Sequence, residues 1–415
     1  MDKNFLFEII NKLKKKGCDQ SDVFFSENFS LSSSRRLDKL EKNEHSENSE
    51  IGIRAILGKK QSIISSNNTN PKNIETLVDK IFEMVSVVPE NQYCGLPDEK
   101  YISQFNKAEF EDLDLLDKKV PTLKDLNNKA SELENSALKN KMIINSEGAE
   151  VAWSKNNYYL AASNGMYQEF SKSSSSYILA ILAGNNKNME REYDYKTEVF
   201  FDDLGDLTKA GETTAKKAIS KLNSRKIKTC KTNVIFESKI AASLIRNLLT
   251  GCNSSLIARG TSFLKDKLNK KIFNDKINIQ DKGDIKKANG SRYFDSEGVK
   301  IKPLDLVKNG DLKDFLIDTY NGKKIKLQSN GRSSGSTNLY FLNGSISFKE
   351  LISSSKRILY VNETIGRGSN LITGDYSVGA SGLMIENGEF SYPVSEITIA
   401  GNLNDIFKNI SLAND

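Results

Sequence analysis

The sequence predicts an α+β protein, in which an N-terminal α+β region of antiparallel strands and long helices is followed by a β-rich C-terminal domain. Segments with apolar residues at helical spacing alternate with segments in which apolar and polar residues take turns, as in antiparallel strands. From Ile272 onward the chain has mainly strand patterns, which are separated by glycine-rich turns. Breaks in these patterns divide the 415 residues into three predicted domains, at 1–88, 108–223 and 230–415.

Two helices and a hairpin are predicted in the first domain. Leu6, Ile9, Ile10 and Leu13 recur at helical spacing and are followed by a glycine, which commonly ends a helix. The predicted elements are a helix at 4–16, an extended segment at 22–29, a hairpin of 51–56 with 61–65, a helix at 73–85 and a connector from 89 to about 107.

Strands dominate the middle of the chain, between two helices. Apolar and polar residues alternate in several consecutive segments, which indicates an antiparallel meander. The predicted elements are a helix near 123–138, strands at 141–146, 150–154, 158–162, 177–183 and 189–200, and a long helix at 204–222. The third domain is predicted to open with a strand at 233–236 and a helix at 239–250.

A single histidine, His45, limits the chemistry that this chain can perform. A Ser-His-Asp or Cys-His arrangement could use only this residue, and a zinc site that needs two imidazoles cannot be built. His45 lies in a polar stretch between Glu44 and Glu47, which is typical of a solvated loop or strand edge. The sequence therefore argues against hydrolysis by this chain alone.

Charge and cysteine usage favour a cytoplasmic protein that does not bind nucleic acid. The 60 Lys and Arg exceed the 54 Asp and Glu by six, but the densest basic runs, at 14–16 and 323–324, are short and far apart. The four cysteines form no C-x-x-C pair, which fits a reducing compartment. The N-terminal segment is predicted to be an amphipathic helix rather than a signal peptide, and no membrane span is expected.

Catalytic motifs are not supported by their surroundings. Gly331–Gly335 matches G-x-S-x-G, but that motif needs a histidine after the serine, and His45 lies far before it. The sequence contains neither a P-loop nor a dinucleotide-binding fingerprint. Asp295 and Glu297 could hold Mg²⁺, although two acids at this spacing are more typical of a turn. Motif chemistry alone therefore favours a binding protein or a partner subunit.

The final third of the chain carries a series of motifs in a fixed order. They are Ser291–Val299, Asn309–Leu312, Thr373–Asp375, Ile385–Gly388 and Tyr392–Asn402. Together these segments resemble the TldD/PmbA family, and the last of them is similar to the PmbA (TldE) branch in particular. The N-terminal half resembles the family more loosely, through Ile51–Ile56 and the helix at 73–85.

This resemblance implies a cytoplasmic zinc metalloprotease of two different subunits, which processes or degrades extended peptides such as modified-peptide precursors and an antitoxin. In that family the TldD-type subunit carries zinc on an H-E-x-x-x-H helix and a late cysteine, and the PmbA-type subunit has the same fold without the metal. Here Ile245, Arg246 and Thr250 stand on the degenerate zinc helix, and Thr398 stands at the cysteine position. The resemblance thus implies no cofactor in this chain and zinc in a TldD-type partner.

Peptide holding and partner contact are the tasks that the resemblance leaves to this chain. It implies that an extended peptide is held by addition to a sheet, where main-chain hydrogen bonds provide affinity. Arg332 is a candidate for orienting a peptide carbonyl or carboxylate, with a surface salt bridge as the alternative. The other candidates for the peptide groove or the partner interface are Asp295, Glu297, Gly298, Gly374 and Asp375.

Three functional hypotheses follow. The first is a non-catalytic PmbA-type subunit of a heteromeric protease, which could pair with itself where its partner is absent. The second is a stand-alone metallopeptidase whose metal site consists of carboxylates in an unrecognised arrangement. The third is a nucleic-acid-associated modulator, suggested by the family's older label of modulator of DNA gyrase. The dispersed lysines argue against the third, because binding to phosphates needs a contiguous basic surface.

Overall fold

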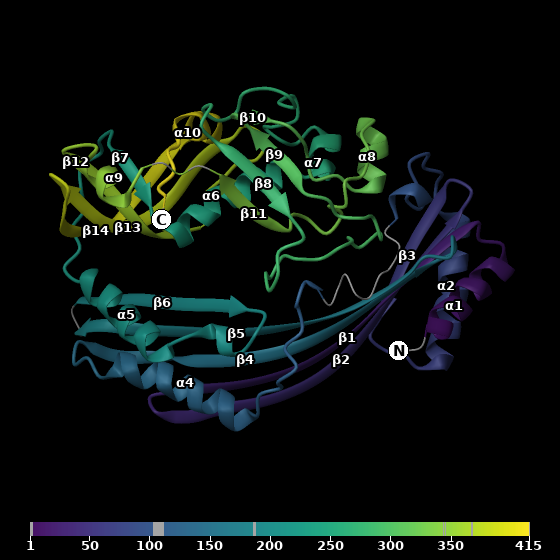
Figure 1. Ribbon diagram of the computed structural model, residues 1–415, viewed down its shortest axis with the longest axis horizontal. Coiled ribbons are helices and arrows are strands. Elements are labelled where there is room, and N and C mark those ends of the chain that lie inside the picture. Colours follow the sequence, from purple (N-terminus) through teal and green to yellow (C-terminus); the bar gives the residue numbers. More distant parts are fainter. Residues whose placement is uncertain are drawn as a thin grey trace.

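A six-stranded antiparallel sheet forms the N-terminal half of the protein in the computed structural model, which describes residues 3–102, 112–185, 188–342, 344, 346–366 and 368–414 (Figure 1). The strand order is β3-β2-β1-β4-β5-β6. The strands are β1 (Gln20–Arg36), β2 (Lys39–Leu57), β3 (Lys60–Ser66), β4 (Ile143–Ala162), β5 (Tyr167–Asn185) and β6 (Asn188–Glu198). Strands β1 and β2 come from the first predicted domain and β4 and β5 from the second, so the two domains share one sheet.

Four helices cover one face of this sheet, two at each end (Figure 1). They are α1 (Lys3–Lys16), α2 (Pro71–Val87), α4 (Leu123–Leu138) and α5 (Leu207–Ser220). Side chains alternate along a strand, so Val23, Phe25 and Leu31 of β1 all point toward the helices and are buried. Their neighbours Phe24, Ser26 and Ser30 point to the other face, and the C-terminal domain lies over that face (Figure 1).

The predicted helices are confirmed with small shifts at their ends, and so is the hairpin that β2 and β3 form. The predicted meander is antiparallel as expected, and the segment predicted at 189–200 is confirmed as β6. The other four segments are too short, because three of them merge into β4 and the fourth is only part of β5. The run Ser173–Ser176 has the composition of a turn, yet it lies in the middle of β5, paired on both sides along part of its length. Pairing with neighbouring strands overrides its weak local preference for strand structure.

The C-terminal domain contains two four-stranded sheets, with the orders β10-β9-β8-β11 and β14-β13-β12-β7. The first comprises β8 (Asn278–Lys282), β9 (Leu304–Lys308), β10 (Asp311–Leu312) and β11 (Asn338–Leu342). The second comprises β7 (Asn233–Phe236), β12 (Arg357–Ile365), β13 (Asp375–Glu386) and β14 (Glu389–Asn402). Strand β7 runs parallel to β12, whereas the other pairings in both sheets are antiparallel.

Helices pack against these sheets, and most of them share one apolar core with the strands. They are α6 (Ser238–Gly251), α7 (Ser254–Arg259), α8 (Thr319–Ile325), α9 (Phe348–Ser353) and α10 (Leu403–Asn409). The prediction of strands and turns alone after residue 272 is therefore incomplete. Helices α8, α9 and α10 are too short for apolar periodicity to reveal them, and side-chain caps such as the Ser347–Glu350 capping box define their starts.

The connector after α2 and the position of His45 can also be compared with the prediction. The connector expected from 89 to about 107 is largely irregular up to residue 102, with one short 3-10 turn at Glu99–Tyr101, and its remainder lies outside the described residues. His45 lies on β2, exposed at the polar end of the sheet, as expected for a solvated strand position. Across the described part of the chain, no helix is both long and apolar enough to cross a membrane.

Candidate functional site

A groove of about 1330 Å³ opens in the C-terminal domain, and both of its sheets contribute to the walls. One wall consists of β7 and the exposed face of α6, and another of side chains from β11 and β12. Helices α9 and α10 and the chain that follows α10 complete it. The apolar side chains that line it are Val234, Ile235, Phe236, Leu244, Ile245, Leu249, Leu339, Phe341, Phe348, Leu351, Ile358, Tyr360, Ile399, Ile406, Ile410 and Leu412. The volume lies above the range of about 300–1,000 Å³ that is usual for small-molecule sites, so the groove has room for a larger ligand.

Strand β7 presents an open edge to this groove. All residues from Thr232 to Ser238 line it, and the sheet order ends at β7. The N–H of Glu237 donates to the carbonyl of Val361 in β12 at 2.9 Å. Because backbone groups alternate along a strand, the N–H and C=O groups of Val234 and Phe236 face away from β12. The edge therefore offers main-chain donors and acceptors to an added strand.

The side of α6 that lines the groove lies beside this strand edge. Ala242, Ile245, Arg246 and Leu249 follow each other at helical spacing and all line the groove. Leu248 is buried in the domain core on the other side of the helix, and Leu244 belongs to both that core and the groove lining. Thr250 is exposed outside the groove lining, and its hydroxyl donates to the Arg246 carbonyl at 2.7 Å. The structure thus places two of the three degenerate zinc-helix positions in the groove.

The late position that corresponds to a cysteine ligand lies close to the same groove. Thr398 is exposed on β14, where it pairs with Gly379, and the next two residues, Ile399 and Ala400, line the groove. The structure therefore brings together the two segments that correspond to the zinc site of the family, although they are far apart in sequence.

The donor set at these positions does not fit zinc. Zinc in proteins is held by imidazole, thiolate or carboxylate groups, whereas the α6 positions carry an aliphatic, a guanidinium and a hydroxyl side chain. Within the described residues, no group of three or more His, Cys, Asp and Glu side chains is close enough to hold a metal ion. We therefore derive no metal-dependent step for this chain.

The turn at Asp295–Gly298 lies elsewhere, at the contact between the two halves of the protein. Asp295 is buried, and its carboxylate accepts from the N–H groups of Glu297, Val299 and Ser333 at 2.9 to 3.1 Å. Gly298 has a φ of +79°. A Cβ there would lie 2.2 Å from the Met166 sulfur, so the turn packs directly on the N-terminal sheet.

Glu297 continues this contact through an ion pair with the N-terminal sheet. One of its oxygens lies 4.0 Å from the Arg54 guanidinium, which itself pairs with Asp22, and the other accepts from the Thr319 N–H at 2.9 Å. Burial raises the pKa of the Glu297 carboxyl above its usual range, against the lowering effect of its hydrogen bond to Thr319 and of Arg54. Glu297 therefore links the two halves at an electrostatic cost.

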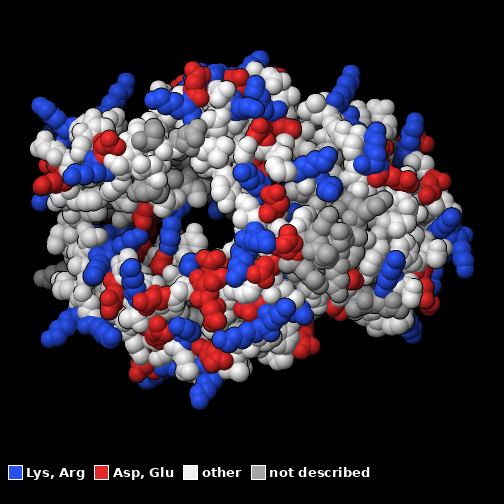
Figure 2. Space-filling view, viewed as in Figure 1, with Lys and Arg blue, Asp and Glu red and all other residues white. Residues whose placement is uncertain are grey.

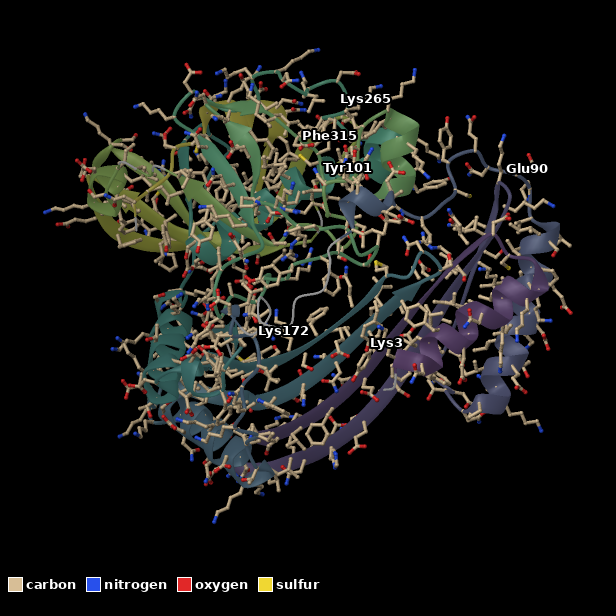
Figure 3. The ribbon with its side chains drawn as sticks, turned by 45° about the vertical axis from the view of Figure 1, so that its right-hand side comes forward. Lys3, Glu90, Tyr101, Lys172, Lys265 and Phe315 are labelled. Carbon is tan, nitrogen blue, oxygen red and sulfur yellow. The ribbon has the colours of Figure 1, made fainter. Side chains whose placement is uncertain are left out.

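Aromatic and basic side chains extend the contact along the sheet. Phe294 packs edge-on against Phe170 of β5, with ring centroids 5.4 Å apart. Lys172 of β5 points into the space between the sheet and the C-terminal domain (Figure 3) and donates to the Asn289 carbonyl. Burial lowers the pKa of Lys172 to about 8, and the nearby charge of Arg292 acts in the same direction. The Asp295–Gly298 turn therefore belongs to an extensive interface within the chain.

Arg332 is fully buried rather than exposed, which corrects the alternative of a surface salt bridge. Its Nε donates to Asp281, and its other nitrogens donate to backbone carbonyls, including that of Lys302 at 2.9 Å. The second Asp281 oxygen accepts from the N–H and the hydroxyl of Thr337, each at 2.7 Å. Thr337 precedes β11 and lines the groove, so the Arg332–Asp281 pair fixes the start of that wall.

Gly374 and Asp375 occupy a third place, at the start of β13. Gly374 has a φ of +81°, and a Cβ there would lie 2.9 Å from the Asn404 side chain. Asp375 is exposed and accepts from Thr373 at 2.7 Å and from Asn402 at 3.1 Å. These contacts fix the passage from β14 into α10, whose Ile406 and Asn409 line the groove. None of the six candidates lines the groove. Arg332, Gly374 and Asp375 support segments beside it, whereas Asp295, Glu297 and Gly298 lie at the contact between the two halves.

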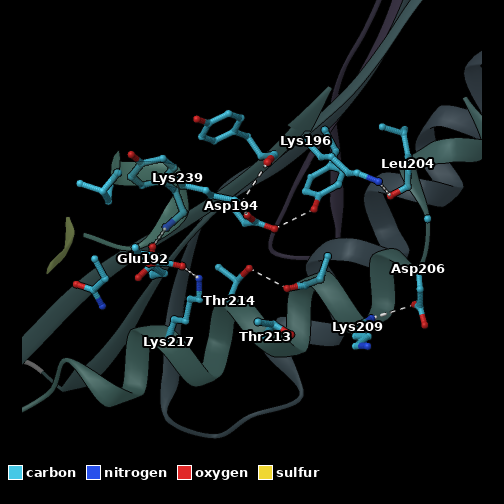
Figure 4. Close-up of a pocket in the computed structure, with 18 residues that line it drawn as sticks. Glu192, Asp194, Lys196, Leu204, Asp206, Lys209, Thr213, Thr214, Lys217 and Lys239 are labelled. Atoms are coloured by element: carbon cyan, nitrogen blue, oxygen red, sulfur yellow. Dashed lines mark hydrogen bonds and ion pairs between the residues drawn. The ribbon is translucent and has the colours of Figure 1, made fainter. Parts of the chain in front are cut away.

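A second pocket, of about 510 Å³, lies between β6, α5 and the first residues of α6 (Figure 4). Its charged side chains neutralise each other: Lys239 pairs with Asp194, and Lys217 pairs with Glu237. The Tyr177 hydroxyl donates to Asp194 at 2.9 Å, and burial together with this carboxylate raises the pKa of Tyr177. The pocket lies where the two halves meet, and none of the sequence-predicted site residues lines it.

The surface charge is mixed. On the face drawn in Figure 2, basic and acidic side chains alternate over the whole molecule and around the opening between the two halves. This face has no contiguous basic stripe of the kind that binds a phosphate backbone.

These features define a class of protein: a large α+β chain whose C-terminal domain carries a mainly apolar groove beside an open strand edge. Family models for the PmbA/TldA metallopeptidases match residues 21–85 (domain 1), 110–222 (central domain) and 229–415 (C-terminal domain). The chain belongs to this PmbA/TldD family, on its PmbA (TldE) branch.

Individual relatives agree with this assignment. The chain is 32% identical to the Escherichia coli O157:H7 metalloprotease PmbA, over 96% of this chain and 88% of that protein. A crystal structure from Bacteroides thetaiotaomicron, named as a modulator of DNA gyrase, superposes with a TM-score of 0.92 at 26% identity and covers 100% of this chain and 94% of that chain. TldE of Thermococcus kodakarensis has a TM-score of 0.85 at 19% identity over 98% and 93% of the two chains, a likeness that bears on the fold alone.

Proposed function

We propose that this chain is the non-catalytic, peptide-holding subunit of a heteromeric PmbA/TldD-type metalloprotease. The observation that carries the proposal is the groove beside β7, which combines apolar walls and an open strand edge with residues unsuited to zinc. An extended peptide would add to β7 as a further strand, while a zinc-bearing TldD-type partner would supply the hydrolysis.

The physical chemistry of the groove supports an extended peptide as its occupant. A peptide that pairs with β7 satisfies the outward main-chain groups of Val234 and Phe236, and this pairing depends little on side-chain identity. Its alternate side chains would enter the apolar walls, such as those formed by Leu339 and Phe348. An unfolded or extended segment has the free main-chain groups that such pairing needs, so the open edge favours this kind of ligand. Precursors of modified peptides and antitoxins belong to this class of substrate.

The partner follows from the chemistry that this chain lacks. Cleavage of a peptide bond in this family relies on a metal-activated water, and the described residues bring no suitable donor set together. A TldD-type subunit with the complete donor set would complement the groove. The complex would operate in the cytoplasm, in line with the scattered cysteines, and the chain could pair with itself where no such partner is present.

Reconstitution tests the proposal directly. This chain and a purified TldD-type subunit should co-elute in size-exclusion chromatography and should cleave an unfolded peptide faster together than the zinc subunit does alone. The isolated chain should bind the same peptide without cleaving it. The proposal fails if the two proteins neither associate nor gain activity, or if the isolated chain does not bind the peptide.

Two other functions remain as alternatives. A stand-alone metallopeptidase would require stoichiometric bound zinc and chelator-sensitive cleavage by the isolated chain, and metal analysis of the purified protein decides this. A nucleic-acid-associated modulator would require binding to duplex DNA at physiological salt, with an affinity that falls steeply as salt rises. The mixed surface charge gives the second alternative little support.

A further inference from the structure

One charged side chain in the groove has no partner among the described residues. The lining contains two charged residues, Glu237 and Arg246. Glu237 is already neutralised by Lys217, which approaches it from α5. The Arg246 guanidinium is exposed, and within the described residues no carboxylate lies within ion-pair distance of it. Among the described residues that line the groove, Arg246 is therefore the one charged side chain without an ion-pair partner.

The surroundings of Arg246 give this charge a defined position. On α6 it is flanked in the groove by Ala242, Ile245 and Leu249, which are apolar and cannot accept a hydrogen bond from a guanidinium through their side chains. A charge beside apolar walls is less screened than one on an open surface, so its interaction with a carboxylate is stronger there. A guanidinium also matches both oxygens of a carboxylate with two parallel N–H donors.

We propose that Arg246 anchors a carboxylate of the extended peptide that occupies the groove. The inference rests on the proposed peptide-holding function and adds a chemical preference to it. Main-chain pairing along β7 would hold any extended segment, whereas Arg246 selects segments that bring a negative charge to α6. That carboxylate is either the C-terminal carboxyl group of the peptide or the side chain of an Asp or Glu within it.

Three peptides distinguish these sources of the carboxylate. Each is N-acetylated and consists of alternating valine and threonine: the first ends in a free carboxylate, the second ends in an amide, and the third ends in an amide and carries one central glutamate. Isothermal titration calorimetry measures their binding to the full-length chain. A bidentate, charge-assisted contact should make one or both acidic peptides bind about tenfold more tightly than the neutral peptide.

Two variants test whether Arg246 causes this preference. Arg246→Gln should remove the preference for acidic peptides, so that all three peptides bind this variant with the same affinity, which a purely structural role of Arg246 would not produce. Lys349→Gln provides the matched control. Lys349 is exposed on α9 and does not line the groove, so this substitution removes one positive charge near the groove but not within it. This control should keep the preference.

The outcomes separate the anchor from the underlying function. If the wild-type chain binds all three peptides equally, or if Arg246→Gln keeps the preference for the acidic ones, the anchor is refuted and peptide holding stands. If the wild-type chain binds none of the three peptides, the proposed groove function is refuted and the anchor with it. If both variants lose the preference equally, the effect is a general one of net charge, and Arg246 is not the anchor.

Discussion

Alanine in place of Gly298 should weaken the contact between the two halves of the protein, because two separate penalties act at this position. The backbone has a φ of +79°, where a residue with a Cβ is strained by about 1–2 kcal/mol. The new Cβ would also lie 2.2 Å from the sulfur and 3.0 Å from the methyl group of Met166, which are the end of a flexible side chain, so the overpacking cost is about 1 kcal/mol, at the low end of its usual range. Together these penalties predict a loss of about 2–3 kcal/mol.

Gly335 provides the matched control for backbone strain. It has a φ of +84°, and nothing lies within 4 Å of a Cβ built on it. Gly335→Ala should therefore cost only the strain of about 1–2 kcal/mol. The difference between the two variants isolates the clash with Met166. In a Met166→Ala background, which opens space at the contact, the cost of Gly298→Ala should fall to that of the control.

Urea unfolding of the four variants and the parent measures these costs. Far-UV circular dichroism reports on the whole chain, whereas the fluorescence of the single tryptophan, Trp153, reports on the buried core of the N-terminal sheet. A weakened contact should lower the midpoint of the dichroism transition and separate it from the fluorescence transition. The packing argument is refuted if Gly298→Ala is no less stable than Gly335→Ala, or if the Met166→Ala background leaves its cost unchanged.

Three further predictions concern the groove, the buried Arg332–Asp281 pair and the contact between the two halves. Val234→Pro removes an outward N–H from β7 and should weaken binding of the neutral peptide about fivefold in calorimetry, whereas Val234→Ala should not. Arg332→Met leaves Asp281 charged and buried and should lower the free energy of unfolding in urea by about 3–5 kcal/mol, and adding Asp281→Asn should recover part of this loss. For Glu297, the folded-state pKa lies above the unfolded one, so the folded state binds more protons between these two values and stability falls as pH rises through that window. Glu297→Gln should flatten this part of the profile of stability against pH, and an unchanged slope would contradict the assignment.

The helix and strand that build the groove could be predicted from the sequence. Helix α6 is defined by apolar residues at helical spacing, and β7 by a short apolar run before it, so both were placed to within one residue. The motifs near Tyr392–Asn402 also identified the branch of the family. These signals are local, and each depends on residues that are close together in the chain.

The surroundings of Arg332 could not be predicted in the same way. It lies in a stretch of glycine and serine that is typical of an exposed turn, yet its side chain is fully buried against Asp281, 51 residues earlier in the chain. Nothing in the local sequence indicates that partner. The open edge of β7 is equally non-local, because it depends on the order in which distant strands assemble.

The side chains of α6 that line the groove bear on two questions, the fit to a metal ion and the proposed binding of a peptide carboxylate. Four side chains at helical spacing, Ala242, Ile245, Arg246 and Leu249, decide the chemistry of the groove. Three of them offer no ligand for a metal, and the fourth places a permanent positive charge there, which repels a divalent cation. Under the proposed anchoring role, the same charge would attract the carboxylate of a peptide. The poor fit of this surface to a metal ion and the proposed preference for acidic peptides therefore have one cause, which is why the preference can be tested without a zinc-bearing partner.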